Sequence, residues 1–144
     1  MKLKWMKNIL HTIIKVETSD FERFPSAKAY ASYTGLTIGE HSSGDKNNRI
    51  GITKQGNTVI RKTLVECAQA LVKGNVYTPK SKRLKSRQKG MDVDIMAYAD
   101  KATERLMKKY QKLIERNVPR NKAIVAVARE LACFIWGMET GNIH

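Results

Sequence analysis

Cysteine is scarce in this sequence, which limits the chemistry that the chain can carry. Its two cysteines, Cys67 and Cys133, lie far apart, and each stands at an apolar position beside alanine or leucine. This placement argues against a disulfide framework and predicts two buried, reduced thiols. No second cysteine or histidine stands at ligand spacing from either one, so the sequence predicts no metal site.

Long apolar runs are also missing. No stretch approaches the roughly 18 apolar residues that a membrane-spanning helix needs. The first fourteen residues combine basic and apolar side chains, but Asn8 and His11 interrupt them and no small-residue cleavage site follows. This pattern is not that of a signal peptide. Together with the reduced cysteines, it predicts a cytoplasmic protein.

Acidic side chains are few. The 144 residues include 13 Asp and Glu against 27 Lys and Arg, which gives a formal net charge of +14. Such an excess implies an anionic partner, either a nucleic acid or an anionic membrane surface. The hydrophobic share of 42% is enough to bury a core, so we expect residues 1–144 to form a single domain.

Apolar residues recur at spacings of three and four along most of the chain, which predicts a mainly α fold of four or five helices. Ser26 and Asn57 are candidate N-caps, and Asp92 and Asp94 are better explained as caps than as metal ligands. No period holds from Gly35 to Gly56, where we expect an ordered Gly/Ser-rich loop or a small irregular hairpin. The expected helices are at residues 3–17, 27–33, 58–73, 93–115 and 120–138.

The last of these helices has the strongest apolar pattern. Its apolar residues repeat at three and four, which predicts burial along one side. Cys67 lies in the corresponding stripe of the helix that follows Asn57, and Phe134 and Trp136 are expected in the core. The apolar stripe of the last helix is Ile124, Val127, Ala128, Leu131, Phe134, Ile135 and Met138.

Ser43 is the sharpest candidate for chemistry. It lies in a glycine-rich loop and can attack a phosphodiester if cations stabilise the transition state. From spacing alone, a phosphate-binding turn or a plain surface loop explains it as well, and His41 has no orienting partner that would make it a general base. The neighbouring cations, which suit phosphate oxygens, are Lys46, Arg49, Lys54, Arg61 and Lys62.

The segment Gly51–Asn57 leads directly into a helix. The N–H groups and positive dipole end at such a helix start suit an anion, which makes Lys54 and Asn57 candidate DNA contacts. The alternative is that Asn57 only caps the helix, and the sequence leaves both open.

A basic linker is expected at residues 75–91. From Lys73 to Lys89 there are seven basic residues and no acid, and Tyr77 is the only aromatic. This composition favours sequence-tolerant contact with a nucleic-acid backbone rather than base stacking. Because the charges lie in a linker rather than on one helix face, a membrane surface is a weaker alternative. The candidate DNA contacts here are Lys80, Lys82, Arg83 and Lys85.

Four segments, in order, resemble the C-terminal domain of a known transposase family. They are Phe21–Leu36, Ser42-Ser43-Gly44, Gly51-Ile-Thr-Lys-Gln-Gly-Asn57 and Lys122–Leu131. The family is that of insertion sequences one-ten, one-sixteen and nine-oh-two, the RNA-guided DEDD/serine recombinases. The similarity spans roughly residues 10 to 138.

The resemblance implies a role for several residues. In the family, the serine directly before the glycine forms a covalent phosphoserine bond with DNA, which here is Ser43, with Ser42 as the adjacent alternative. The resemblance also implies DNA as partner, with a structured guide RNA and a homo-oligomer in the full-length protein. The first helix would be the second half of a helix-hairpin-helix element.

The sequence also departs from the family. The N-terminal RuvC-like domain, whose four carboxylates bind divalent metal, has no counterpart here, so no cofactor is expected in this chain. Ile38 stands where the family usually has proline. The leading interpretation is therefore the serine-bearing half of a DNA transposase, and the alternative is a non-enzymatic nucleic-acid-binding remnant.

Overall fold

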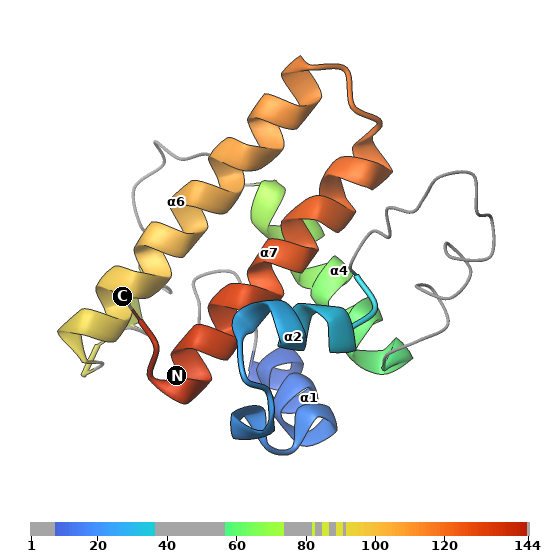
Figure 1. The fold of residues 1–144 in the computed structure, drawn as a ribbon. Helices are drawn as coiled ribbons and strands as arrows, with labels where there is room; N and C mark the ends of the chain where they lie inside the picture. Colours follow the sequence, from blue (N-terminus) through green and yellow to red (C-terminus); the bar gives the residue numbers. More distant parts are fainter. Residues whose placement is uncertain are drawn as a thin grey trace.

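A computed structural model of the chain describes residues 8–36, 57–73, 82, 85–86, 89–90 and 92–143 (Figure 1). These residues form α-helices with one short 3₁₀ helix, and no strand occurs among them. The predicted mainly α fold is therefore confirmed. The elements are α1 (Asn8–Thr18), η1 (Phe21–Arg23), α2 (Ala27–Tyr33), α4 (Thr58–Val72), α6 (Val93–Glu115) and α7 (Arg120–Thr140).

Polar side chains set where α2 and α6 begin. Ser26 Oγ accepts the backbone N–H of Ala29 at 3.1 Å, which starts α2 at the predicted residue. Asp92 caps α6 by accepting the N–H of Asp94 at 2.8 Å. Asp94 itself lies inside the first turn, where its negative charge suits the positive end of the helix. These local hydrogen bonds explain why sequence alone located the starts of α2 and α6.

The turn between α6 and α7 is also set locally. Asn117 has a left-handed backbone with φ of 63°, and its N–H bonds to the carbonyl of Ile114 at 2.9 Å. The N–H of Val118 bonds to Leu113 O at 3.0 Å, which completes a Schellman motif and ends α6. Pro119 then precedes α7, so the two longest helices fold back side by side (Figure 1).

Helix α7 is the centre of the molecule. It packs against α2, α4, α6 and η1, and its end is two residues beyond the predicted Met138. We expected burial along one side, but α7 is buried more widely because helices cover it from several directions. Beyond the predicted stripe, Ala123, Ala132 and Gly137 are buried too, whereas Phe134 and Trp136 are only half-buried at the edge of the core.

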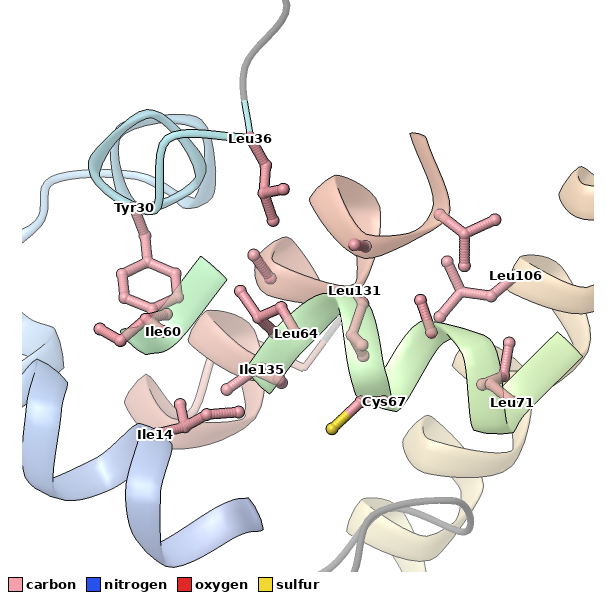
Figure 2. Close-up of a cluster of buried hydrophobic side chains, with 14 of the residues drawn as sticks. Ile14, Tyr30, Leu36, Ile60, Leu64, Cys67, Leu71, Leu106, Leu131 and Ile135 are labelled. Carbon is pink, nitrogen blue, oxygen red and sulfur yellow. The ribbon is translucent and has the colours of Figure 1, made fainter. Parts of the chain in front are cut away.

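The core joins α1, α2, α4, α6 and α7 around large apolar side chains. Figure 2 shows Ile60, Leu64 and Leu71 of α4 alongside Leu131 and Ile135 of α7, and all five are at most 1% exposed. The apolar face predicted for α4 is therefore confirmed. Burial of this kind stabilises by about 1.5–3 kcal/mol per large side chain.

The two cysteines differ. Cys67 is fully buried in this core, so its predicted burial is confirmed. Burial raises the pKa of its thiol to about 12, so the thiol stays protonated. Cys133 was expected to be buried as well, but it is only half-buried, so that prediction was wrong in degree. It faces the start of α2, where its Sγ lies 3.8 Å from the carbonyl oxygen of Ala27.

An ion pair ties α1 to the end of α7. His11 Nε2 donates to Glu139 Oε1 at 3.0 Å, and Lys15 Nζ lies 3.7 Å from Glu139 Oε2. The hydrogen bond from His11 and the charge of Lys15 hold the pKa of Glu139 below its ordinary value, against the effect of burial. The sequence analysis treated His11 only as an interruption of an apolar run.

No helix in the parts of the chain that the structure describes combines the length and apolar character needed to cross a membrane. This finding concerns α1, α2, α4, α6 and α7 alone.

Replacing Gly137 with alanine is expected to destabilise the protein by about 1–3 kcal/mol, because the core there is already full. An added Cβ would lie 2.5 Å from Tyr98 Oη and 2.9 Å from the carbonyl oxygen of Asn142. Urea unfolding measures the change. In a Tyr98→Phe background the same substitution should cost less, and an equal cost in both backgrounds would contradict the proposed clash.

Replacing Glu139 with glutamine is expected to lower stability by roughly 1–2 kcal/mol at pH 7. Because the folded protein holds the pKa of this carboxyl down, its contribution is present above the unfolded pKa of about 4.3. That contribution is lost as the pH falls through the folded pKa, so the two proteins should converge in acid. Thermal unfolding between pH 3 and 7 tests this, with the exposed Glu115→Gln as control. A difference that persists unchanged to pH 3 would rule out the carboxylate charge as its source.

Candidate nucleic-acid interface

The predicted nucleophile lies outside the described residues. The same holds for Ser42 and for five candidate contacts, which are Lys46, Arg49, Lys54, Lys80 and Arg83. The structure describes the residues on either side of 37–56, which are the end of α2 and the start of α4, and we call these two ends the base. The N–H of Asn57 bonds to the carbonyl of Tyr33 at 3.3 Å, so the end of α2 and the start of α4 lie together.

An aromatic cluster supports this base. The rings of Phe24 and Tyr33 are 4.9 Å apart, and the guanidinium of Arg23 lies over both at 4.5 and 4.8 Å. Tyr30 is fully buried beneath, with its hydroxyl 2.8 Å from that of Thr18. The first segment that resembles the transposase family is therefore held together by ring contacts and by a buried hydrogen bond.

Asn57 is the residue that fixes the start of α4. Its Oδ1 accepts the N–H groups of Val59 and Ile60 at 2.9 and 3.1 Å. Its Nδ2 donates to Glu17 Oε1 on α1 at 3.3 Å. The predicted N-cap is confirmed, and it occupies two of the amides that an anion would use at this helix end. A direct contact of Asn57 with DNA remains a prediction.

The remaining sequence-predicted cations differ in exposure. Lys62, Lys82 and Lys85 are exposed, whereas Arg61 is half-buried on α4 and has an interaction of its own. Arg61 and Lys62 lie in the first turns of α4, a helix with no acidic residue in its first turn. The positions of these four side chains do not test whether they contact DNA, so that contact stays a prediction.

A strongly basic groove runs along α6, and the sequence analysis did not identify it. It consists of two adjoining hollows of about 690 and 740 Å³ that share Lys101, Arg105, Lys109 and Glu130. Residues of α7 line the groove opposite α6, and Lys28 and Ala31 of α2 line one of its ends. We call this surface the α6 groove; its charged lining residues are Lys28, Lys101, Glu104, Arg105, Lys108, Lys109, Lys112, Arg116, Arg129 and Glu130.

Glu130 of α7 organises the middle of the α6 groove. One of its oxygens accepts a short hydrogen bond from Arg105 Nε, and the other accepts one from Lys109 Nζ at 2.6 Å. Burial alone would raise the pKa of this carboxyl, but the bonds from Lys109 and Arg105 bring the pKa below its ordinary value. Glu130 is therefore ionised near neutral pH and holds two cations in place.

The sequence does contain a pattern that indicates this groove, but neighbouring acidic residues make the pattern hard to recognise. Lys101, Arg105, Lys109 and Lys112 recur at three and four, which places them on one helix face. Asp100, Glu104 and Glu115 lie between and beyond them, so the stretch does not stand out as a charge run.

The described residues contain no group of three or more His, Cys, Asp or Glu side chains that could hold a metal ion.

Comparison with known proteins shows the family to which the chain belongs. Residues 2–83 match the Transposase IS116/IS110/IS902 family. The matched range includes α1, α2 and most of the basic linker, together with Ser43 and Asn57. No solved structure matches the chain significantly.

Three curated relatives are similar over parts of the chain. The transposase candidate y4qE of Sinorhizobium fredii is 39% identical over 85% of this chain and 30% of its own length. The transposase for insertion sequence element IS1111A of Coxiella burnetii is 32% identical over 61% of this chain and 25% of its length. That for element IS1328 of Yersinia enterocolitica is 28% identical over 48% and 21%. The chain thus spans less than a third of each relative.

Substitution of Asn57 separates its capping role from contact with DNA. Asn57→Ala is expected to destabilise the protein by about 1 kcal/mol, because two amides of α4 lose their acceptor. Asn57→Ser keeps a capping oxygen and should retain most of the stability. Chemical denaturation measures both, together with DNA affinity. If Asn57→Ser folds like the wild type but binds DNA more weakly, the side chain contacts DNA directly.

Proposed function

The chain belongs to the Transposase IS116/IS110/IS902 family, and we propose that it is a DNA-binding domain that acts in transposition through a serine nucleophile. The match over residues 2–83 carries this proposal, because that range contains Ser43 together with the base that flanks it. The net charge of +14 supports DNA as the partner.

The proposed reaction is attack by Ser43 on a DNA phosphodiester. The Oγ–P bond forms as one P–O bond of the DNA backbone breaks, and the hydroxyl proton passes to a base or to the leaving oxygen. This step gives a phosphoserine link and a free DNA hydroxyl, and reversal on another strand exchanges the ends. The transition state carries extra negative charge, which cations offset.

Cations near the serine would offset that negative charge. We assign Lys46, Arg49, Lys54 and Arg61 to the scissile phosphate, with Lys62 and Asn57 beside them. The described surroundings support this assignment in one respect, since the start of α4 is bonded to the end of α2 through Asn57 and Tyr33. A fixed base of this kind lowers the entropy lost when a phosphate is positioned.

Other parts of the proposal rest on the family alone. We include a homo-oligomer, a structured guide RNA and a divalent metal held by the RuvC-like domain of the full-length relatives. The cytoplasmic location, the single domain at 1–144, the basic linker at 75–91 and the partial helix-hairpin-helix element also stay predictions. Within the linker, contact with the DNA backbone is assigned to Lys80, Lys82, Arg83 and Lys85.

A second candidate function is nucleic-acid binding without catalysis. The α6 groove favours it, because a cationic surface binds phosphates whether or not a serine reacts. The two functions differ in one observable, the covalent link between protein and DNA.

A denaturing-gel assay for that link tests the proposal. The chain is mixed with nicked or junction DNA, with and without the RuvC-like domain of a full-length relative added in trans. We expect an adduct with the wild type and none with Ser43→Ala, while DNA binding is unchanged, because only the nucleophile is lost.

Ser42→Ala is the matched control, since it removes an adjacent hydroxyl of the same kind. It should keep the adduct, and the opposite result for the two serines would move the nucleophile to Ser42. Equal adduct with all three proteins, or none with any of them, would reject the serine mechanism. Salt-sensitive binding without an adduct would leave the binding function in its place.

A further inference from the structure

Most cations of the α6 groove have no acidic partner among the described residues. Glu130 engages Arg105 and Lys109, and Glu104 accepts from Lys108 at 2.6 Å. Five further cations line the groove and form no ion pair with another described residue, and an array of like charges is unfavourable unless an anion joins it. These five are Lys28, Lys101, Lys112, Arg116 and Arg129.

The shape of the groove favours an extended anion over a compact one. Its cations follow α6 from Lys101 to Arg116, a distance of about 22 Å at the rise of an α-helix. They do not converge on one point, as they would around a single phosphate. One strand of duplex DNA presents about six phosphates over that length.

The lining is suited to a backbone rather than to bases. Among the described residues that line the two hollows there is no Asn, Gln, Ser, Thr or Tyr. The neutral members are Ala31, Leu113, Cys133 and Phe134, and the ring of Phe134 already packs edge-on against Tyr98 at 5.7 Å. Lysine and arginine contact phosphates of any sequence, and the lining offers no Asn or Gln amide of the kind that reads adenine.

We propose that the α6 groove is a second DNA-binding surface, which holds the sugar–phosphate backbone of one strand independently of base sequence. This inference rests on the proposed function only in taking DNA as the partner. Nothing in it requires Ser43 to react.

The groove is separate from the start of α4. Lys28, at the first turn of α2, lines the groove, whereas Tyr33 at the other end of α2 bonds to Asn57. These two positions are about 8 Å apart along the helix axis. DNA held in the groove is therefore close to the start of α4 without occupying it.

Paired charge removal tests the surface. Lys101→Gln/Lys112→Gln removes two exposed groove cations, and Arg120→Gln/Lys122→Gln removes two exposed cations that neither line the groove nor belong to the basic run. Glutamine keeps the helix propensity of lysine, and circular dichroism verifies folding. Binding to duplexes of two unrelated sequences is measured from 50 to 200 mM salt.

The groove variant should weaken binding to both duplexes alike and reduce the slope of log K against log salt by about 1.8, two contacts at 0.9 each. The control variant should change the slope by much less. Equal losses in the two variants would show that diffuse charge, not the groove, binds DNA, and would overturn the inference.

Cys133 provides a second test that needs no substitution. Its half-buried thiol lines the groove, while Cys67 is fully buried in the core and serves as the internal control. DNA at saturating concentration should slow alkylation of Cys133 several-fold and leave Cys67 unmodified throughout. If a mobility shift shows that DNA binds but the alkylation rate of Cys133 is unchanged, the inference that the groove binds DNA is overturned while the proposed function stands. Absence of any binding would overturn both.

Discussion

Helix α7 is buried against α2, α4 and α6, and the positions of the other helices depend on this packing. Ile135 and Leu131 lie in the core at 0% exposure, and Trp136 Nε1 donates to the carbonyl of Phe21 at 3.2 Å, which fixes η1 as well. Two carboxylates of the same helix face outward from this core. Glu139 pairs with His11 and Lys15 of α1, and Glu130 pairs with Arg105 and Lys109 of α6. The buried helix α7 therefore positions both α1 and two cations of the α6 groove.

The short helix α2 connects the two candidate DNA surfaces. Its first turn faces Cys133 and contributes Lys28 to the α6 groove, while its last residue, Tyr33, accepts the N–H of Asn57. Because Tyr30 is buried and bonded to Thr18, α2 cannot rotate without breaking core contacts. The surface proposed to hold a DNA backbone and the base of the segment that bears Ser43 are thus linked by one rigid element. This arrangement suits a domain that positions one DNA strand near a reacting one.

Local features were predicted well because they depend on near neighbours in sequence. The starts of α2, α4 and α6 follow from Ser26, Asn57 and Asp92, whose side chains bond amides two or three residues away. Features that join distant residues were missed. His11 and Glu139 are 128 residues apart, and no local pattern pairs them. The α6 groove was missed because acids interrupt its cations along α6 and because Lys28 and Arg129 come from other helices. Cys133 was misjudged because its exposure depends on where the start of α2 lies.

The sequence by itself determined the helices, the family and the cationic character of this protein, since periodicity, capping residues, motif order and net charge are all readable along the chain. Only the tertiary structure decided which cations act together. Lys28, Arg105 and Arg129 become neighbours because α2 and α6 both pack against α7, and all three side chains line one hollow. Likewise, Asn57 could be named as a cap from sequence, but its bond to Glu17 exists only because α1 packs against α4. Packing of buried apolar faces brings polar residues together that the sequence keeps far apart.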